Sequence, residues 1–158
     1  EEDDQAPYFI LQWPVDSAPT ASTEFQLVQF EMYPRTEACA APQLSGPYVH
    51  THWLPFWNAA VVAHRKSNDE HVKVLGVGAD MRDIKELVVD DDALAIRIPY
   101  DFKEEDLFVT GLAVDTTCGG EVAVLHPTLA ELPDCPSSPI LIVATTDAKL
   151  RFFTLSNM

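Results

Sequence analysis

The sequence predicts an all-β protein built from short strands. Runs of apolar or alternating residues of strand length recur along the chain, and Pro, Gly, Asp, Asn and Ser residues separate them. The 12 prolines leave little room for the apolar stripe of an amphipathic helix, so helix should be a minor component. With 158 residues, 47% of them apolar, the chain is large enough for a core of its own.

About eleven segments are expected to form strands, each bounded by turn residues. In the first half they are residues 8–13, 24–32, 48–54, 58–64 and 71–77. In the second half they are residues 84–89, 95–98, 107–116, 121–125, 140–145 and 150–155.

Two of these runs, residues 59–63 and 140–144, are apolar on both faces. Such strands are packed between two layers, as in a β-sandwich or in stacked propeller blades. The W-D dipeptide of WD repeats is absent from the sequence. At about 40 to 50 residues per four-stranded blade, the length corresponds to roughly three blades, too few to close a ring.

The sharpest local prediction is a hairpin at residues 140–155. Two strand-like runs flank the tetrapeptide Thr146-Asp147-Ala148-Lys149, in which Asp147 favours a tight turn.

The charge of the chain indicates what it binds. Lys and Arg total 10 against 25 Asp and Glu, a formal net charge of −15. Such a surface repels nucleic-acid backbones and anionic membranes but attracts basic proteins. Direct nucleic-acid and membrane binding are therefore not expected.

The remaining composition predicts a soluble protein with reduced thiols. Cys39, Cys118 and Cys135 are odd in number and widely spaced, which favours neither a disulfide framework nor a zinc site. No apolar run reaches the roughly 18 residues that span a bilayer. The acidic start at Glu1, without Met, suggests a piece of a longer polypeptide.

Motifs for catalysis or metal binding are weak. His50 and His52 would share one face of a strand, but no third ligand is evident, and paired strand histidines more often pack or face solvent. The acidic runs at residues 90–92 and 104–106 lack the EF-hand pattern and suggest solvated loops. His64, His71 and His126 belong to no recognisable nucleophile arrangement, so neither an enzyme nor a cofactor is expected.

Residues 76–92 are the candidate partner-binding region. They mix acidic and apolar residues, and binding residues concentrate in loops on a rigid β scaffold. Exposed charges there would steer a basic partner, and Met81 would slow its dissociation. The alternative is an ordinary loop without a partner. The predicted contact residues are Asp80, Met81, Arg82, Asp83, Asp90, Asp91 and Asp92.

Several blocks of sequence carry a family resemblance. They are residues 57–63, 72–76, 87–89 and 111–117, followed by the most specific block at residues 136–155, where a proline-led apolar strand, a Thr-Asp turn and an aromatic strand follow one another. In order and spacing they resemble the later part of the N-terminal β-propeller of the cytoplasmic-filament nucleoporin called CAN in vertebrates, which has a fungal counterpart. One departure is Ala148, where the family often has Gly, so a positive backbone angle would be strained there.

The resemblance implies the last blades of a β-propeller, incomplete in this chain, with residues 1–158 forming about three blades and no second domain. It also implies a nucleoporin of the nuclear pore complex, at its cytoplasmic face, that works among other nucleoporins in mRNA and protein transport. The propeller would dock a DEAD-box RNA helicase, and any ATP chemistry would belong to that partner. The alternatives are an acidic all-β adaptor that binds basic peptides or proteins outside the pore, and a hydrolase that uses His50 or His52.

Overall fold

The computed structural model describes residues 8–12, 18–22, 26–30, 46–67, 70–78, 84–89, 95–121, 123, 134 and 138–156. Every helix or strand assigned within these ranges is a strand, which confirms the all-β prediction. The chain forms two compact units, Glu1–Glu37 and Ala38–Met158.

The first unit contains one hairpin. Strand β1 (Tyr8–Gln12) pairs antiparallel with β2 (Gln26–Phe30), with Tyr8 opposite Phe30 and Gln12 opposite Gln26. Both strands lie inside the segments that the alternating apolar pattern predicts.

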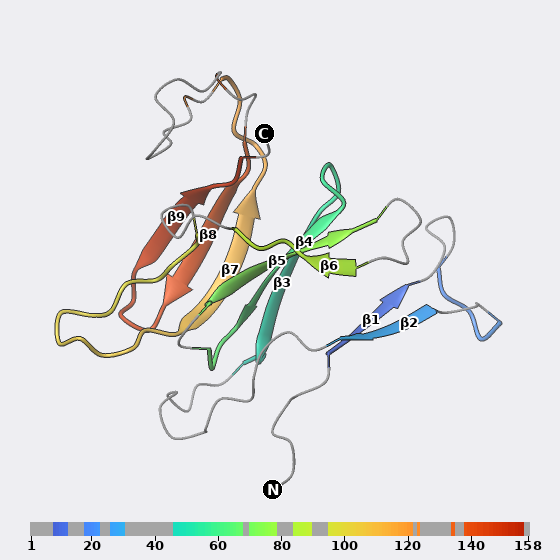
Figure 1. Ribbon diagram of the computed structural model, residues 1–158, viewed down its shortest axis with the longest axis horizontal. Helices are drawn as coiled ribbons and strands as arrows, with labels where there is room; N and C mark the ends of the chain where they lie inside the picture. Colours follow the sequence, from blue (N-terminus) through green and yellow to red (C-terminus); the bar gives the residue numbers. More distant parts are fainter. Residues whose placement is uncertain are drawn as a thin grey trace, which may run out of the picture. The chain divides into compact units, whose positions relative to one another are not determined.

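The second unit contains two antiparallel sheets (Figure 1). The first is a four-stranded meander in which β3 (Val49–Leu54), β4 (Ala59–His64), β5 (Val72–Val77) and β6 (Ile84–Glu86) follow one another in space as in sequence. Strand β4, one of the two inner strands, consists of valine and alanine up to His64, because β-branched and small residues suit a strand covered on both faces.

The second sheet is a three-stranded meander of β7 (Val109–Asp115), β8 (Ile140–Thr145) and β9 (Leu150–Thr154). A register shift between Val109 and Gly111 marks a bulge at the start of β7. The predicted hairpin is confirmed, and Ala148 in its turn has a φ of 60°, the positive angle that was expected to strain a residue other than Gly.

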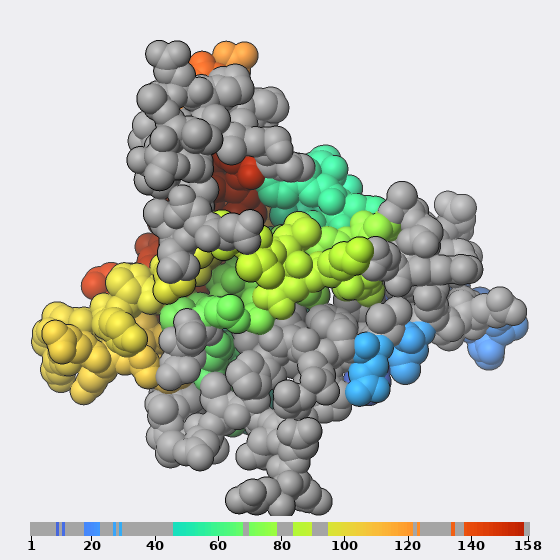
Figure 2. All heavy atoms as spheres, in the orientation of Figure 1, coloured from blue at the N-terminus to red at the C-terminus, as the bar shows by residue number. Residues whose placement is uncertain are grey.

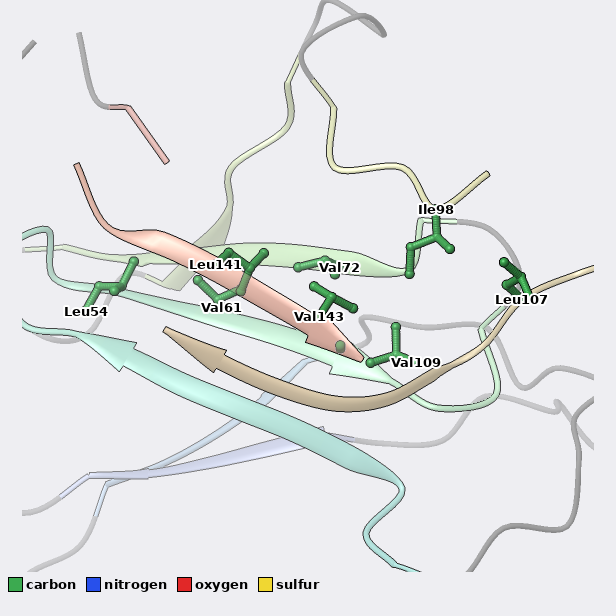
Figure 3. Packing of buried hydrophobic residues seen from close by; sticks show 9 residues of the cluster. Leu54, Val61, Val72, Ile98, Leu107, Val109, Leu141 and Val143 are labelled. Carbon is green, nitrogen blue, oxygen red and sulfur yellow. The ribbon is translucent and has the colours of Figure 1, made fainter. Parts of the chain in front are cut away.

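The two sheets share one hydrophobic core. Leu54, Val61 and Val72 of the first sheet meet Leu141 and Val143 of the second, and all five side chains are buried (Figure 3). Strands β3 and β7, which lie at one edge of their respective sheets, are neighbours. The first strand of each meander therefore lies at the junction of the sheets.

One strand prediction differs from the structure. Residues 95–98 were expected to form a strand and are irregular. Ile96 and Ile98 pack against the core, so the alternating pattern there reflects side-chain packing without ladder hydrogen bonds. The strand predicted at residues 121–125 lies mostly outside the described residues; only Glu121 and Ala123 are described there, and neither is in a strand.

Candidate functional site

The predicted partner-binding residues lie outside the described part of the chain. This applies to Asp80, Met81, Arg82, Asp83, Asp90, Asp91 and Asp92. Residues 79–83 connect β5 to β6, so their flanks are known, and their role as contacts stays a prediction.

An exposed apolar strip lies between the two predicted acidic segments. Leu87, Val88 and Val89 follow β6 and are 52%, 75% and 47% exposed. The backbone N–H of Leu87 donates to the carbonyl of Val74 at 2.8 Å, which extends the pairing of β6 by one residue. The Leu87 side chain lies over Gly76, where an added Cβ would approach its Cδ2 to 3.2 Å.

The outer face of the second sheet is also apolar. Because Leu141 and Val143 of β8 point into the core, Ile142 between them points the other way. The strand register places Ala113 and Phe152 on either side of Ile142. Phe152 is 63% exposed, so this sheet carries apolar side chains on both faces.

The outer edge of β9 presents backbone groups. Leu155 N–H donates to the Pro139 carbonyl at 2.9 Å, and Thr145 N–H donates to the Lys149 carbonyl at 3.1 Å. The odd-numbered residues of β9 therefore bond to β8, and the N–H and C=O groups of residues 150, 152 and 154 point away from it. Strand β9 ends the order of its sheet among the described strands.

A protruding loop, residues 99–106, precedes β7. We call it the aromatic-acidic loop; it is the yellow segment that stands out from the surface in Figure 2. Phe102 is 91% exposed and Tyr100 is 67% exposed. Glu104 has a φ of 63° in its turn.

A groove of about 200 Å³ lies at the base of this loop. One wall is held in place by His71, whose Nε2 donates to the carbonyl of Leu107 at 2.9 Å in a buried position. The residues that line the groove are Glu70, His71, Arg97, Ile98, Pro99, Tyr100, Asp106 and Leu107.

The histidine pair of β3 faces the core side of the first sheet. His50 and His52 lie opposite Ala63 and Val61, both buried in the core, so the prediction that they share a face is confirmed. Burial lowers the pKa of His50, and the positive charge of Arg65 lowers it further. No group of three or more His, Cys, Asp or Glu side chains suited to a metal ion occurs among the described residues.

The turn between β8 and β9 contains an ion pair with a structural role. Arg151 contacts both carboxylate oxygens of Asp147 at 3.1 Å, and its guanidinium also donates to the hydroxyl of Thr145. Hydrogen bonds from Arg151 and then from Thr145 hold the pKa of Asp147 far below its usual range. These groups satisfy one another, so the turn offers little to a ligand.

Comparison with known proteins assigns the chain to no family. No family model matches the chain, and no curated protein matches it. In the parts of the chain that the structure describes, no helix is long and apolar enough to cross a membrane.

The sequence did not predict the aromatic-acidic loop as a candidate binding site. The segment Tyr-Asp-Phe-Lys-Glu-Glu-Asp at residues 100–106 carries the signal, two aromatic residues beside acidic ones, whereas the acidic run at residues 104–106 alone predicts only a solvated loop. Aromatic residues usually indicate a core, so the exposure of Phe102 becomes visible only in the fold.

Proposed function

We propose that this chain is the C-terminal part of the β-propeller of a nucleoporin at the cytoplasmic face of the nuclear pore complex. It acts there as a non-catalytic docking scaffold for a DEAD-box RNA helicase in mRNA export. The resemblance of residues 136–155 to the late hairpin of that family supports this class of protein.

The main observation in support of a propeller is that two antiparallel meanders pack against each other through their first strands. Propeller blades are four-stranded meanders arranged around a common axis, with the first strand of each blade innermost. The contact of β3 with β7, inside a core that both sheets share, supports this arrangement.

Two surfaces of the second sheet that no described strand covers support the same proposal. A neighbouring blade would cover its apolar outer face, where Ile142 and Phe152 lie. A fourth strand would pair with the outward backbone groups of β9, as β6 pairs with β5 in the first sheet. In a self-contained sandwich, no further blade would cover the apolar outer face and no fourth strand would pair with β9.

The charge supports a basic protein as the partner. A net charge of −15 attracts a basic surface over the Debye length of about 8 Å at physiological salt and raises the association rate. Rim charges of this kind set the association rate and the salt dependence of a complex.

Binding of the 158-residue chain to recombinant DEAD-box helicases tests the proposal. We expect an association rate that falls as salt rises, measured by biolayer interferometry at several salt concentrations, with a lysine-rich histone as the basic control protein. The absence of binding to every helicase overturns the proposal. Equal affinity for the histone also overturns it, in favour of a general acidic adaptor.

A further inference from the structure

The aromatic-acidic loop holds the most exposed large apolar side chain among the described residues. Phe102 has 91% of its surface in water, and Tyr100, two residues before it, has 67%. Exposing a phenylalanine ring forgoes the free energy that its burial would contribute. Aromatic side chains, Phe among them, are enriched at the buried cores of protein interfaces.

Hydrogen bonds hold the backbone on either side of Phe102 in a defined turn. Asp101 Oδ1 accepts from the backbone N–H groups of Lys103 at 2.7 Å and of Glu105 at 2.9 Å. Two backbone hydrogen bonds between Asp101 and residues 104 and 105 close the turn. A partner would therefore bind Phe102 without the entropic cost of ordering the loop.

The base of the loop is fixed to the core. Ile98 before the turn and Leu107 after it are both buried in the cluster that joins the two sheets. The carbonyl of Leu107 also accepts the hydrogen bond from buried His71. The exposed tip is thus carried by a rigid support.

The charges around the ring determine which partner fits. In sequence it is flanked by four carboxylates, on Asp101, Glu104, Glu105 and Asp106, and by one cation, Lys103, whose Nζ lies 5.5 Å from the centroid of the ring. Glu104 and Glu105 are exposed, whereas the Asp101 carboxylate is engaged by the turn. A basic surface complements this loop, and an acidic one is repelled.

We propose that the aromatic-acidic loop is a docking site for a basic protein surface, with Phe102 entering an apolar pocket and Glu104 and Glu105 facing Lys or Arg side chains around it. The inference rests on the proposed function for the choice of partner, the DEAD-box helicase. It assigns part of the contact to residues 99–106, separate from the predicted contacts at residues 80–83 and 90–92.

The test compares Phe102→Ala with a matched exposed aromatic. Phe56 lies in the turn between β3 and β4, is 73% exposed and has no charged neighbour in residues 53–58, so Phe56→Ala serves as the control. We expect Phe102→Ala to weaken helicase binding at least about tenfold, mainly through faster dissociation, and Phe56→Ala to leave it unchanged. The double variant Glu104→Gln, Glu105→Gln should slow association at low salt.

Each outcome separates the two proposals. If the wild-type chain binds the helicase and Phe102→Ala binds equally well, the docking loop is wrong and the proposed function stands. If the wild-type chain does not bind, the proposed function fails and this inference fails with it. Thermal unfolding of Phe102→Ala should match the wild type, because the ring contributes little to the core; a lowered midpoint together with weakened binding would also overturn the docking role.

Discussion

Two turns of this molecule have the same backbone conformation, but their side chains make different contacts. In residues 101–105 and residues 145–149, the N–H of the fourth residue donates to the carbonyl of the first, and the N–H of the first donates to the carbonyl of the fifth. The fourth residue is left-handed in both, with a φ of 63° at Glu104 and 60° at Ala148. This is the geometry of a type I turn followed by a bulge.

The second position of each turn shows the difference. In the turn between β8 and β9 it is Thr146, whose backbone N–H donates to the carbonyl of Phe108 at 3.0 Å and whose hydroxyl accepts from the N–H of Phe108 at 3.2 Å. In the aromatic-acidic loop it is Phe102, which extends into solvent. Thr146 therefore links its turn to the residue that precedes β7, whereas Phe102 is exposed to solvent and could contact a partner.

The largest expected effect comes from removing the ion pair that only the second turn has. Arg151→Ala leaves the carboxylate of Asp147 without its main partner in a side chain that is 17% exposed. We expect the midpoint of thermal unfolding to fall by several degrees, because hydrogen bonds to charged groups are the stronger class. Lys149 also contacts Asp147 but is 71% exposed, so Lys149→Ala is the control and should change little. Equal effects of the two variants would refute a structural role for Arg151.

A smaller effect is expected from Asp101, which closes the first turn. Asp101→Ala removes the acceptor of two backbone N–H groups and should lower the free energy of unfolding by about 1 kcal/mol. Asp101→Asn keeps an oxygen at the same place and should retain most of the stability. Denaturant unfolding measures both variants. If Asp101→Asn is as unstable as Asp101→Ala, the carboxylate acts through its charge instead of as a cap.

The smallest effect should be a gain, and it should be equal in the two turns. Glu104→Gly and Ala148→Gly relieve a left-handed residue, and the relief exceeds the extra chain entropy of Gly by about 0.5 to 1 kcal/mol. Glu104→Ala, which removes the charge but keeps the Cβ, is the control and should show no gain. A gain in only one turn, measured by denaturant unfolding, would show that the two backbones are not equivalent.

The sequence predicted the elements whose signals are local. The hairpin of β8 and β9 could be found because Pro139 and Asp147 bracket an apolar strand, and the strain at Ala148 followed from the need for a positive φ. Residues 95–98 were assigned wrongly to a strand because alternation reports which side chains are buried, whereas a strand also needs a neighbour to pair with.

The candidate site was less accessible from the sequence. The contacts predicted at residues 80–83 and 90–92 remain untested, since they lie outside the described residues. The aromatic-acidic loop depends on where the fold places Phe102, and an aromatic residue between charged ones fits a buried or an exposed position equally well. Only the packing of Ile98 and Leu107 into the core forces the residues between them outward.

The open edge of β9 also bears on colloidal behaviour. Among the described strands β9 has no neighbour on its outer side, so its backbone groups beside Leu150 and Phe152, which are 61% and 63% exposed, are a template on which a second molecule can add a strand. Between two copies that each carry a charge of −15, long-range repulsion opposes this pairing. Salt shortens the range of that repulsion and strengthens apolar contact, so we expect the isolated chain to associate through this edge more readily as salt rises.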